Sequence, residues 1–424
     1  MIKPPLALAA SLFSLAIAAP AVAQDTLRAD IAADYKANLA SLFDHFHRNP
    51  ELSHREFNTA ARLAGEIRAL GYDVTEKVGG TGVVAVMRNG EGPTVMIRAD
   101  MDGLPVEEAS GLAYASTVTQ EDIDGKVKPV MHACGHDTHI TSLVGTARML
   151  AARKEKWKGT LVLIGQPAEE RISGARDMLA DGLYKRFPKP DYALAFHVAA
   201  DRPSGKIEVP IGAAYASADS VDIIVHGVGA HGASPNKGID PVLIASQIVV
   251  SLQSVVSRSI DPLQAGVITV GAIHGGAKHN IIGDKVEMQL TVRSLDPAVR
   301  AQLLDGIDRV AKGVAVSMGV PEKLMPEVIR SKTETTPPTV NDAATAAIVK
   351  EALIKGMGAE DFAYFVTPEL GVKGVYFAVG GTPAKDVEKA PSHHSPFFKI
   401  EPEPAIKAGT EAMVIAAMRL FNGQ

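Results

Sequence analysis

The chain has 424 residues, of which 46% are hydrophobic and 21% are charged, and its formal net charge is −5 at pH 7. This composition is ordinary for a globular protein, and a slightly acidic chain without a basic tract is not expected to bind nucleic acid. A chain of this length exceeds what one hydrophobic core usually serves, so we expect two domains.

The first 23 residues have the pattern of a secretory signal peptide. An early cation, Lys3, is followed by an apolar run over residues 6–19 and by the small residues Ala21-Val22-Ala23, which predict cleavage before Gln24. The apolar run is shorter than the ~20 residues that span a bilayer, so we expect no membrane association after cleavage. The mature chain is therefore expected to be exported, as a periplasmic or secreted protein.

The hydrophobic pattern predicts the elements of a first domain in chain order. Helices are expected over residues 27–48 and 56–70, then strands over 81–87 and 94–99, a helix over 138–153, and strands over 161–164 and 192–196. Strands that alternate with helices predict an α/β fold, in which chemistry lies at the carboxyl ends of strands. Asp100, Glu169, Glu170 and His197 all follow predicted strands.

The pattern changes at about residue 212. A strand is expected over residues 219–226, a helix over 241–256, strands over 266–273 and 286–293, and a helix over 297–317. This unit predicts an α+β domain over residues 212–330 that is inserted into the first domain. The first domain then comprises residues 24–211 and 331–424, with a further helix expected over residues 342–355.

The central motif is Cys134-Gly135-His136, where a loop meets the start of the 138–153 helix. The glycine allows a tight turn, so the thiolate and the imidazole can point at one ion. Cys134 is the only cysteine, so it cannot form a disulfide within the chain. A motif this short often matches by chance, and a buried structural cysteine beside surface histidines is the simpler alternative.

More ligands are available at other predicted strand ends and loops. Glu170, His197 and one histidine of the loop over residues 391–396 bring the candidates to five, which is too many for one catalytic zinc ion. Two ions about 3.5–4 Å apart that share a bridging water fit better. Glu169 and Glu170 should point in opposite directions, so we expect one to bind metal and the other to transfer protons. The alternative is a solvated acidic loop.

A rival signal is the glycine pattern over residues 227–232, which matches a dinucleotide-binding loop after a strand. The next helix is expected only from Pro241, and no acidic residue stands about twenty positions beyond the glycines to hold a ribose. We therefore reject a dinucleotide site. His231, within this loop, is interpreted as a polar group that is brought to another site.

Six motifs together resemble a known family. They are His47–Leu52, Arg98–Pro105, Met131–His139, Gln166–Glu170, Gly358–Phe362 and His394–Pro396. In sequence and order they are similar to the amidohydrolase branch of the dinuclear zinc aminoacylase and carboxypeptidase family, which includes hippurate hydrolases and auxin-conjugate hydrolases. The resemblance implies a mixed-sheet, zinc-exopeptidase-like catalytic domain with an inserted lid and dimerisation domain.

The same resemblance implies roles for individual residues. His231 would polarise the scissile carbonyl, Asn280 and Arg293 would hold the carboxylate of the substrate, Glu169 would be the general base and acid, and Asp102 would orient a ligand. The metal ligands would be Cys134, His136, Glu170, His197 and His394.

We therefore expect a metal-dependent hydrolase that cleaves the amide bond of N-acyl amino acids or short peptides with a free carboxylate. Its expected cofactors are two divalent metal ions, which could be zinc, manganese, cobalt or nickel. The resemblance also implies a homodimer or tetramer that is formed through the inserted domain. Two alternatives stay open: a peptide carboxypeptidase or carbamoyl-amino-acid hydrolase with the same site, and a non-catalytic binding protein with the same fold.

Overall fold

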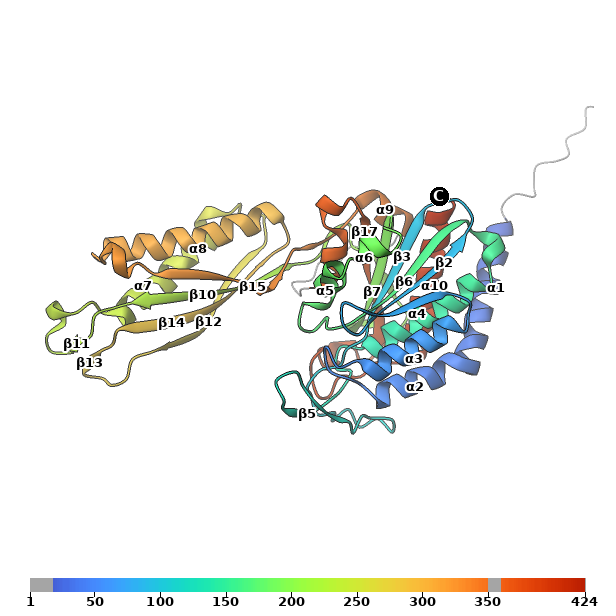
Figure 1. Ribbon diagram of the computed structural model, residues 1–424, viewed down its shortest axis with the longest axis horizontal. Coiled ribbons are helices and arrows are strands. Elements are labelled where there is room, and N and C mark those ends of the chain that lie inside the picture. Colours follow the sequence, from blue (N-terminus) through green and yellow to red (C-terminus); the bar gives the residue numbers. More distant parts are fainter. Residues whose placement is uncertain (1–17, 350–359, 424) are drawn as a thin grey trace, which may run out of the picture.

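The computed structural model describes residues 18–349 and 360–423, with side chains over residues 26–347 and 360–423. Figure 1 shows two units, a large one at the right and a small one at the left. We define the small unit as residues 217–336 and the large unit as the other described residues. Each unit has its own sheet, and the expected α/β fold class is confirmed.

The large unit is built on a seven-stranded mixed sheet of order β1-β2-β6-β3-β7-β17-β8. Strands β6, β3, β7 and β17 are parallel to one another, and β1, β2 and β8 are antiparallel to their neighbours. The strands are β1 (Asp73–Val78), β2 (Gly82–Asn89), β3 (Thr94–Asp100), β6 (Gly159–Gln166), β7 (Tyr192–Pro203), β8 (Ile207–Glu208) and β17 (Lys373–Thr382).

Both faces of this sheet are covered, because its central strands are apolar along their length and successive side chains point to opposite faces. Ile97 and Leu163 pack on one face with the long helices, whereas Met96 and Ile164 pack on the other with short helices. The long helices are α1 (Ala18–Asp34), α2 (Ala40–Arg48), α3 (Phe57–Arg68), α4 (His136–Ala151) and α10 (Pro402–Phe421). The short ones are α5 (Gly174–Ala180), α6 (Leu183–Arg186) and the 3-10 helix Asp361–Val366.

The predicted helix over residues 27–48 is divided in the structure. A π-helical turn over Tyr35–Leu39 separates α1 from α2. Helix α1 begins at Ala18, inside the predicted signal peptide, and residues 1–17 lie outside the described residues. The signal peptide and its cleavage before Gln24 therefore stay predictions. Of the helix expected over residues 342–355, α9 (Ala343–Val349) is described, and residues 350–359 are not.

The small unit is a four-stranded antiparallel sheet of order β12-β14-β10-β15 with two helices on one face. Buried side chains of β10 and β14, such as Ile223 and Met288, pack against α7 and α8. The elements are β10 (Ser217–His226), α7 (Pro241–Ser254), β12 (Gly266–Gly275), β14 (Lys285–Ser294), α8 (Pro297–Ser317) and β15 (Glu327–Thr336). At the end farthest from the large unit, β11 (Ala230–His231) pairs with β13 (Ile281–Ile282) (Figure 1).

Strand β15 was not predicted from the sequence, and the predicted boundary at residue 330 falls inside this strand. Most of the side chains of β15 are exposed and polar, so the strand lacks the apolar alternation that marks a half-buried strand. The chain enters and leaves the small unit beside a short two-stranded sheet, β9 (Gly212–Tyr215) with β16 (Thr339–Asn341). A separate hairpin, β4 (Thr119–Glu121) with β5 (Val127–Pro129), projects from the large unit.

One strand of the large unit is longer than expected. Strand β7 continues to Pro203, so His197 lies within it and not at its carboxyl end. The reason is its pairing with β17, in which His197 lies opposite Ala378 and the ladder continues past that point. Asp100 and the Glu169-Glu170 pair do follow or end strands, at β3 and β6 respectively.

Candidate metal centre

The Cys-Gly-His motif forms the turn into α4. Gly135 has a φ angle of 86°, and a Cβ atom at this position would lie 2.4 Å from Val198 Cγ1. The glycine is therefore required both for the left-handed backbone and for the close approach to β7. Cys134 is buried before this turn, and His136 is fully buried as the first residue of the helix.

His136 faces Glu170 across a short gap. The Nδ1–H of His136 donates to the backbone carbonyl of Asp102 at 2.8 Å, which leaves a lone pair on Nε2. That atom lies 3.8 Å from Glu170 Oε1. Neither atom has a hydrogen-bond partner among the described residues, although both are buried. Two ligand atoms that each lie about 2.0–2.2 Å from the same zinc ion would be separated from each other by a gap similar to the one between Nε2 and Oε1.

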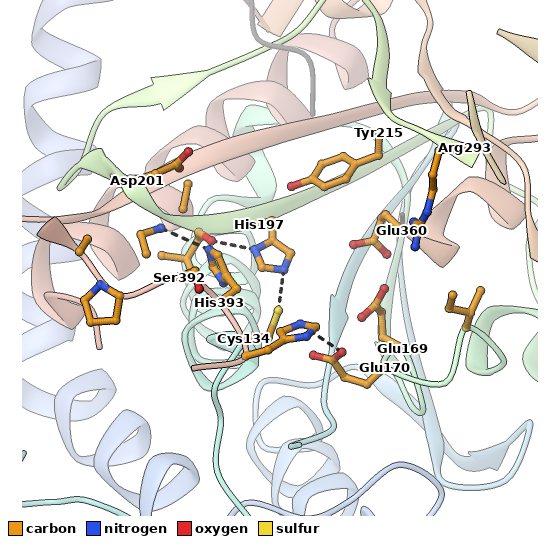
Figure 2. A pocket seen from close by; sticks show the side chains of 17 residues that line it. Cys134, Glu169, Glu170, His197, Asp201, Tyr215, Arg293, Glu360, Ser392 and His393 are labelled. Carbon is orange, nitrogen blue, oxygen red and sulfur yellow. Dashed lines mark hydrogen bonds and ion pairs between the residues drawn. The ribbon is translucent and has the colours of Figure 1, made fainter. Parts of the chain in front are cut away.

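Cys134 and His197 form a second close pair, and Cys134 also lies beside His136 and Glu170, with ligand atoms within 4.8 Å of one another. Cys134 Sγ and His197 Nε2 are 3.3 Å apart, and His197 Nδ1–H donates to the carbonyl of Val198 at 2.7 Å (Figure 2). His197 therefore also directs a lone pair from Nε2 toward the cavity. Thiolate sulfur, imidazole nitrogen and carboxylate oxygen are the ligands that zinc and its neighbours in the first transition series use.

Both histidines of the late loop reach this place. His394 adopts a φ angle of 66°, its backbone N–H donates to Ala133 at 2.9 Å, and its Nε2 lies 3.4 Å from Glu170 Oε2. His393 lies beside Cys134 and His197, with ligand atoms within 4.8 Å of one another. However, His393 Nε2 accepts a hydrogen bond from Ala200 at 3.3 Å, so its other nitrogen carries the proton in the neutral ring. That other nitrogen, Nδ1, is buried without a hydrogen-bond partner among the described residues, and the choice of His394 as the ligand stays a prediction.

Asp102 holds the acidic pair in position. Its carboxylate is buried and accepts hydrogen bonds from the Ser53 hydroxyl at 2.6 Å and from the backbone N–H groups of Glu169 and Glu170 at 3.1 Å each. Ala168, just before the pair, has a φ angle of 48°, which turns the chain away from the strand. Asp102 thus orients the segment that carries Glu170, and its role toward a metal ligand stays a prediction.

The centre is strongly acidic. Arg98 is fully buried and donates to Gln166, Asp100, Glu360 and Asp361 at distances of 2.7 to 3.1 Å. Three buried acids bond to this one guanidinium, and three more that are buried or nearly buried lie in the same centre: Asp102, Glu169 and Glu170. Buried charges of one sign are costly unless cations are present, so the site favours positive charge.

The pKa values of His136 and Cys134 also indicate that the site favours positive charge. Burial lowers the pKa of His136, but Asp100, Asp102 and Glu170 outweigh burial and raise it to about 10. Burial, assisted by Glu170 and Glu169, raises the pKa of the Cys134 thiol well above its usual range. The carboxylates thus favour a cation beside His136, and a divalent ion there would also stabilise the Cys134 thiolate.

Glu169 lies in a different environment from Glu170. It groups with Glu360 and Asp361, with oxygen atoms within 4.8 Å of one another. Burial raises the pKa of Glu169 well above its usual range, and the charge of Glu360 adds to this effect. Glu170 faces the histidines, and Glu169 faces the cavity beside Glu360 (Figure 2). The adjacent acids therefore point to different neighbours, as expected for separate roles.

The cavity has a volume of about 600 Å³ and is lined by both units. The small unit contributes Arg293, which is half-buried and has no ion pair among the described residues. Burial lowers the pKa of Arg293, and Asp219 only partly compensates. The side chain points toward Glu360 and Glu169 (Figure 2). A guanidinium in this position can bind an anionic group that enters the cavity.

The other two predicted residues of the small unit do not reach this cavity. His231 and Asn280 are exposed, and both belong to the β11–β13 region at the far end of the small unit (Figure 1). Gly232 N–H donates to the Asn280 carbonyl at 2.9 Å, so the two residues are near each other. Their predicted roles stay predictions, and within one chain this arrangement does not bring them to the metal ligands.

The sequence analysis assigned no role to several residues of the site. His139 donates from Nδ1 to Asp100 at 2.5 Å and accepts from Val198 N–H at 2.9 Å, so it orients β3 and β7 and has no free lone pair. Glu360, Asp361 and Tyr215 also lie at or beside the cavity. Glu360 and Asp361 stand in a motif that supported the resemblance. Tyr215 carried no signal, because a single tyrosine beside alanines does not indicate a site.

Comparison with known proteins agrees with this geometry. Residues 96–419 match the peptidase family M20/M25/M40. Over 391 residues the chain is 38% identical to thermostable carboxypeptidase 2 of Saccharolobus solfataricus, covering 89% of this chain and 93% of that protein. It is 36% identical over 342 residues to hippurate hydrolase of Campylobacter jejuni, covering 78% and 86%.

A solved structure shares the fold as well. The YXEP protein of Bacillus subtilis, described as a dinuclear metal binding peptidase from the M20 family, has a TM-score of 0.77 and 27% sequence identity to this chain. The match covers 92% of this chain and 99% of that one. The resemblance inferred from the six motifs is therefore confirmed, and the chain belongs to peptidase family M20.

Proposed function

We propose that this protein is a metal-dependent hydrolase that cleaves the amide bond of N-acyl amino acids with a free carboxylate. One observation carries the proposal: His136 Nε2 and Glu170 Oε1 face each other without hydrogen-bond partners among the described residues, beside the buried acid Glu169. The hippurate hydrolase relative, whose name describes cleavage of an N-acyl amino acid, supports the substrate class.

Five residues would hold two divalent ions: Cys134, His136, Glu170, His197 and His394. Their donor set of thiolate, imidazole and carboxylate suits zinc, manganese, cobalt or nickel. When bound, such ions supply Lewis-acid chemistry, which makes water a better nucleophile at neutral pH and polarises a carbonyl group.

Glu169 would move the protons. Its carboxylate takes one proton from the attacking water, and the new C–O bond forms at the amide carbon. The protonated Glu169 then delivers that proton to the amide nitrogen as the C–N bond breaks, so the products are a carboxylic acid and a free amino acid. Burial beside Glu360 raises the pKa of Glu169, which makes its carboxylate a stronger base for the first step. Arg293 would hold the substrate carboxylate through two parallel hydrogen bonds.

A panel of substrates tests the proposal. Protein whose metal content has been measured is incubated with N-acyl amino acids, dipeptides and N-carbamoyl amino acids, with and without a chelator. We expect hydrolysis of the first group that is lost on chelation and restored by metal. Protein that holds metal but hydrolyses none of the three groups would contradict the proposal. Faster hydrolysis of dipeptides would favour the second candidate, a carboxypeptidase, which the name of the Saccharolobus relative supports.

We also propose that two copies associate through the small unit. Strand β12 lies at the edge of its sheet and exposes Val267 and Ile273, whereas the other edge strand, β15, carries charged side chains such as Lys332. An apolar edge is suited to pairing, and a charged edge opposes it. The neighbouring helix α7 exposes Val242, Leu243 and Val250 on its outer face.

The run Pro241–Ser259 is the one helix among the described residues that is long and apolar enough to cross a membrane by length and composition alone. Its inner face, which includes Ile248 and Leu252, packs in the core of the small unit. A second copy of the chain would cover the outer face of this helix. Its exposed apolar side chains would then be explained without a bilayer. The expected export of the chain remains our proposal and rests on the pattern of its first 23 residues.

A further inference from the structure

Tyr215 is a rigid part of the cavity wall. It is the last residue of β9 and lies opposite Thr339 of β16 in the two-stranded sheet. Its ring packs edge-to-face on Tyr376, with ring centroids 5.3 Å apart and an angle of 83° between the planes. Because the backbone is paired and the ring is packed, the hydroxyl is held in one direction. Figure 2 shows it directed into the cavity above His197.

The hydroxyl of Tyr215 has no hydrogen-bond partner among the described residues. The neighbouring tyrosines differ in this respect: Tyr376 donates to Glu360, and Tyr184 donates to the carbonyl of Phe365 at 2.9 Å. Tyr215 is only partly buried and lines the cavity, so its hydroxyl is free to donate a hydrogen bond there. The missing acceptor at Tyr215 is therefore expected to be water or a ligand in the cavity.

The surroundings of Tyr215 restrict what it can do. Burial raises the pKa of Tyr215, and the nearby groups Glu360, Cys134 and Glu169 add to this effect. The phenol therefore keeps its proton and acts as a hydrogen-bond donor. It lines the same cavity as Cys134, Glu169 and Glu170, and Figure 2 shows it on the side opposite these residues. A substrate carbonyl between the two sides would meet the acid on one side and this donor on the other.

The reaction needs such a donor. Attack on the amide carbon places negative charge on the carbonyl oxygen, and hydrogen-bond donors aimed at that oxygen lower the barrier. Within one chain His231, the residue expected to do this, lies at the far end of the small unit, so the chain's own cavity must supply any further donor. Arg293 is the other strong donor of the cavity, and in the proposed function it holds the substrate carboxylate.

We propose that Tyr215 is a catalytic residue that donates a hydrogen bond to the carbonyl oxygen of the scissile amide. This inference rests on the proposed function. As the C–O bond forms, the π electrons of the carbonyl move to this oxygen, and the Tyr215 O–H stabilises the charge without giving up its proton. When the C–N bond breaks, the electrons return to re-form the carbonyl, and Glu169 supplies the proton to the leaving nitrogen.

The test compares Tyr215→Phe with wild type and with a control, Tyr184→Phe. Each variant removes one hydroxyl, but the Tyr184 hydroxyl bonds to a backbone carbonyl away from the cavity. Tyr215→Phe should lower kcat by roughly 100- to 1,000-fold, the effect of removing one oxyanion donor, with KM nearly unchanged. Its metal content and melting temperature should equal those of wild type, whereas Tyr184→Phe should keep full kcat.

A second readout uses a phosphonamidate analogue of an N-acyl amino acid, whose tetrahedral centre mimics the transition state. Tyr215→Phe should weaken its binding by a factor similar to the loss in kcat, but should weaken product binding far less. Unchanged kcat in Tyr215→Phe, or a rise in KM alone, would overturn the inference while the proposed function stands. Wild-type protein that hydrolyses no acyl amino acid or peptide would overturn the proposed function, and this inference with it.

Discussion

The two units differ in how their site residues come together. In the large unit, residues from four separate segments, Cys134, Glu170, His197 and His394, meet at one centre, which is largely buried and has His394 on its exposed side. In the small unit, only Arg293 of the three predicted residues lies at the cavity. The large unit fixes its residues by sheet pairing and burial, whereas the small unit places residues on a separate sheet. In the structure that sheet holds His231 and Asn280 away from the cavity.

Metal removal should produce the largest difference in behaviour between the two units. All groups of candidate ligands among the described residues lie in the large unit. Chelation should therefore abolish hydrolysis and lower the stability of the large unit, because an ion that binds the native state stabilises it. Hydrogen exchange should become faster in α4 and β7 and stay unchanged in α8. Faster exchange in α8 as well would show that the two units are not independent in this respect.

Replacing Arg293 with Ala tests what the small unit contributes. A substrate whose carboxylate is converted to an amide would leave the guanidinium poorly paired, at a cost on the order of 2–5 kcal/mol of transition-state binding. Wild type should discriminate strongly between an N-acyl amino acid and its amide, and Arg293→Ala should discriminate weakly. Arg300→Ala is the control, since Arg300 pairs with Asp219. Equal rates on acid and amide in wild type would show that the small unit recognises something else.

A pH-dependent contribution to stability should come from the large unit. His47 bonds Asp137 at 2.6 Å and Glu108 at 3.2 Å; burial lowers its pKa, but these two carboxylates raise it to about 9. Since the unfolded value is 6.5, this contribution is complete below pH 6.5 and is lost as pH rises through about 9. It amounts to about 3 kcal/mol.

Urea unfolding at pH 6.5 and pH 9.5 measures this effect. His47→Gln should be much less stable than wild type at pH 6.5, and the difference should shrink at pH 9.5. The matched control is His226→Gln in the small unit, where an exposed pair with Glu327 should contribute less than about 1 kcal/mol. A His47→Gln difference that does not change with pH would contradict the assignment.

A smaller effect is expected at the proposed contact between copies. A charge on the exposed edge of β12, as in Ile273→Lys, should oppose strand pairing and weaken association by at least about tenfold, or 1.4 kcal/mol. Analytical ultracentrifugation measures this, with Ile329→Lys on β15 as the control at the opposite edge. Wild-type protein that is monomeric at all concentrations would contradict the proposed association.

The features that could be predicted from the sequence also differ between the two units. The proximity of candidate ligands beside a glycine turn or an apolar strand, such as His136 and Glu170, could be predicted because the motif and the strand define their surroundings. Strand β15 could not, since its side chains are exposed and polar. Tyr215 could not either, because its value as a donor depends on its contact with Tyr376 and on residues distant in the chain. The far position of His231 depends on how the two units are arranged, which no local pattern encodes.

We propose one division of roles in this centre: Glu169 transfers protons, and Glu170 binds metal. It is tested most directly by measuring bound metal and turnover side by side in Glu169→Gln and Glu170→Gln. Glu169→Gln should keep its metal and lose roughly two to four orders of magnitude in kcat, because it removes the general base. Glu170→Gln should lose metal. If Glu169→Gln loses the metal and Glu170→Gln retains it, the two roles have been assigned in reverse.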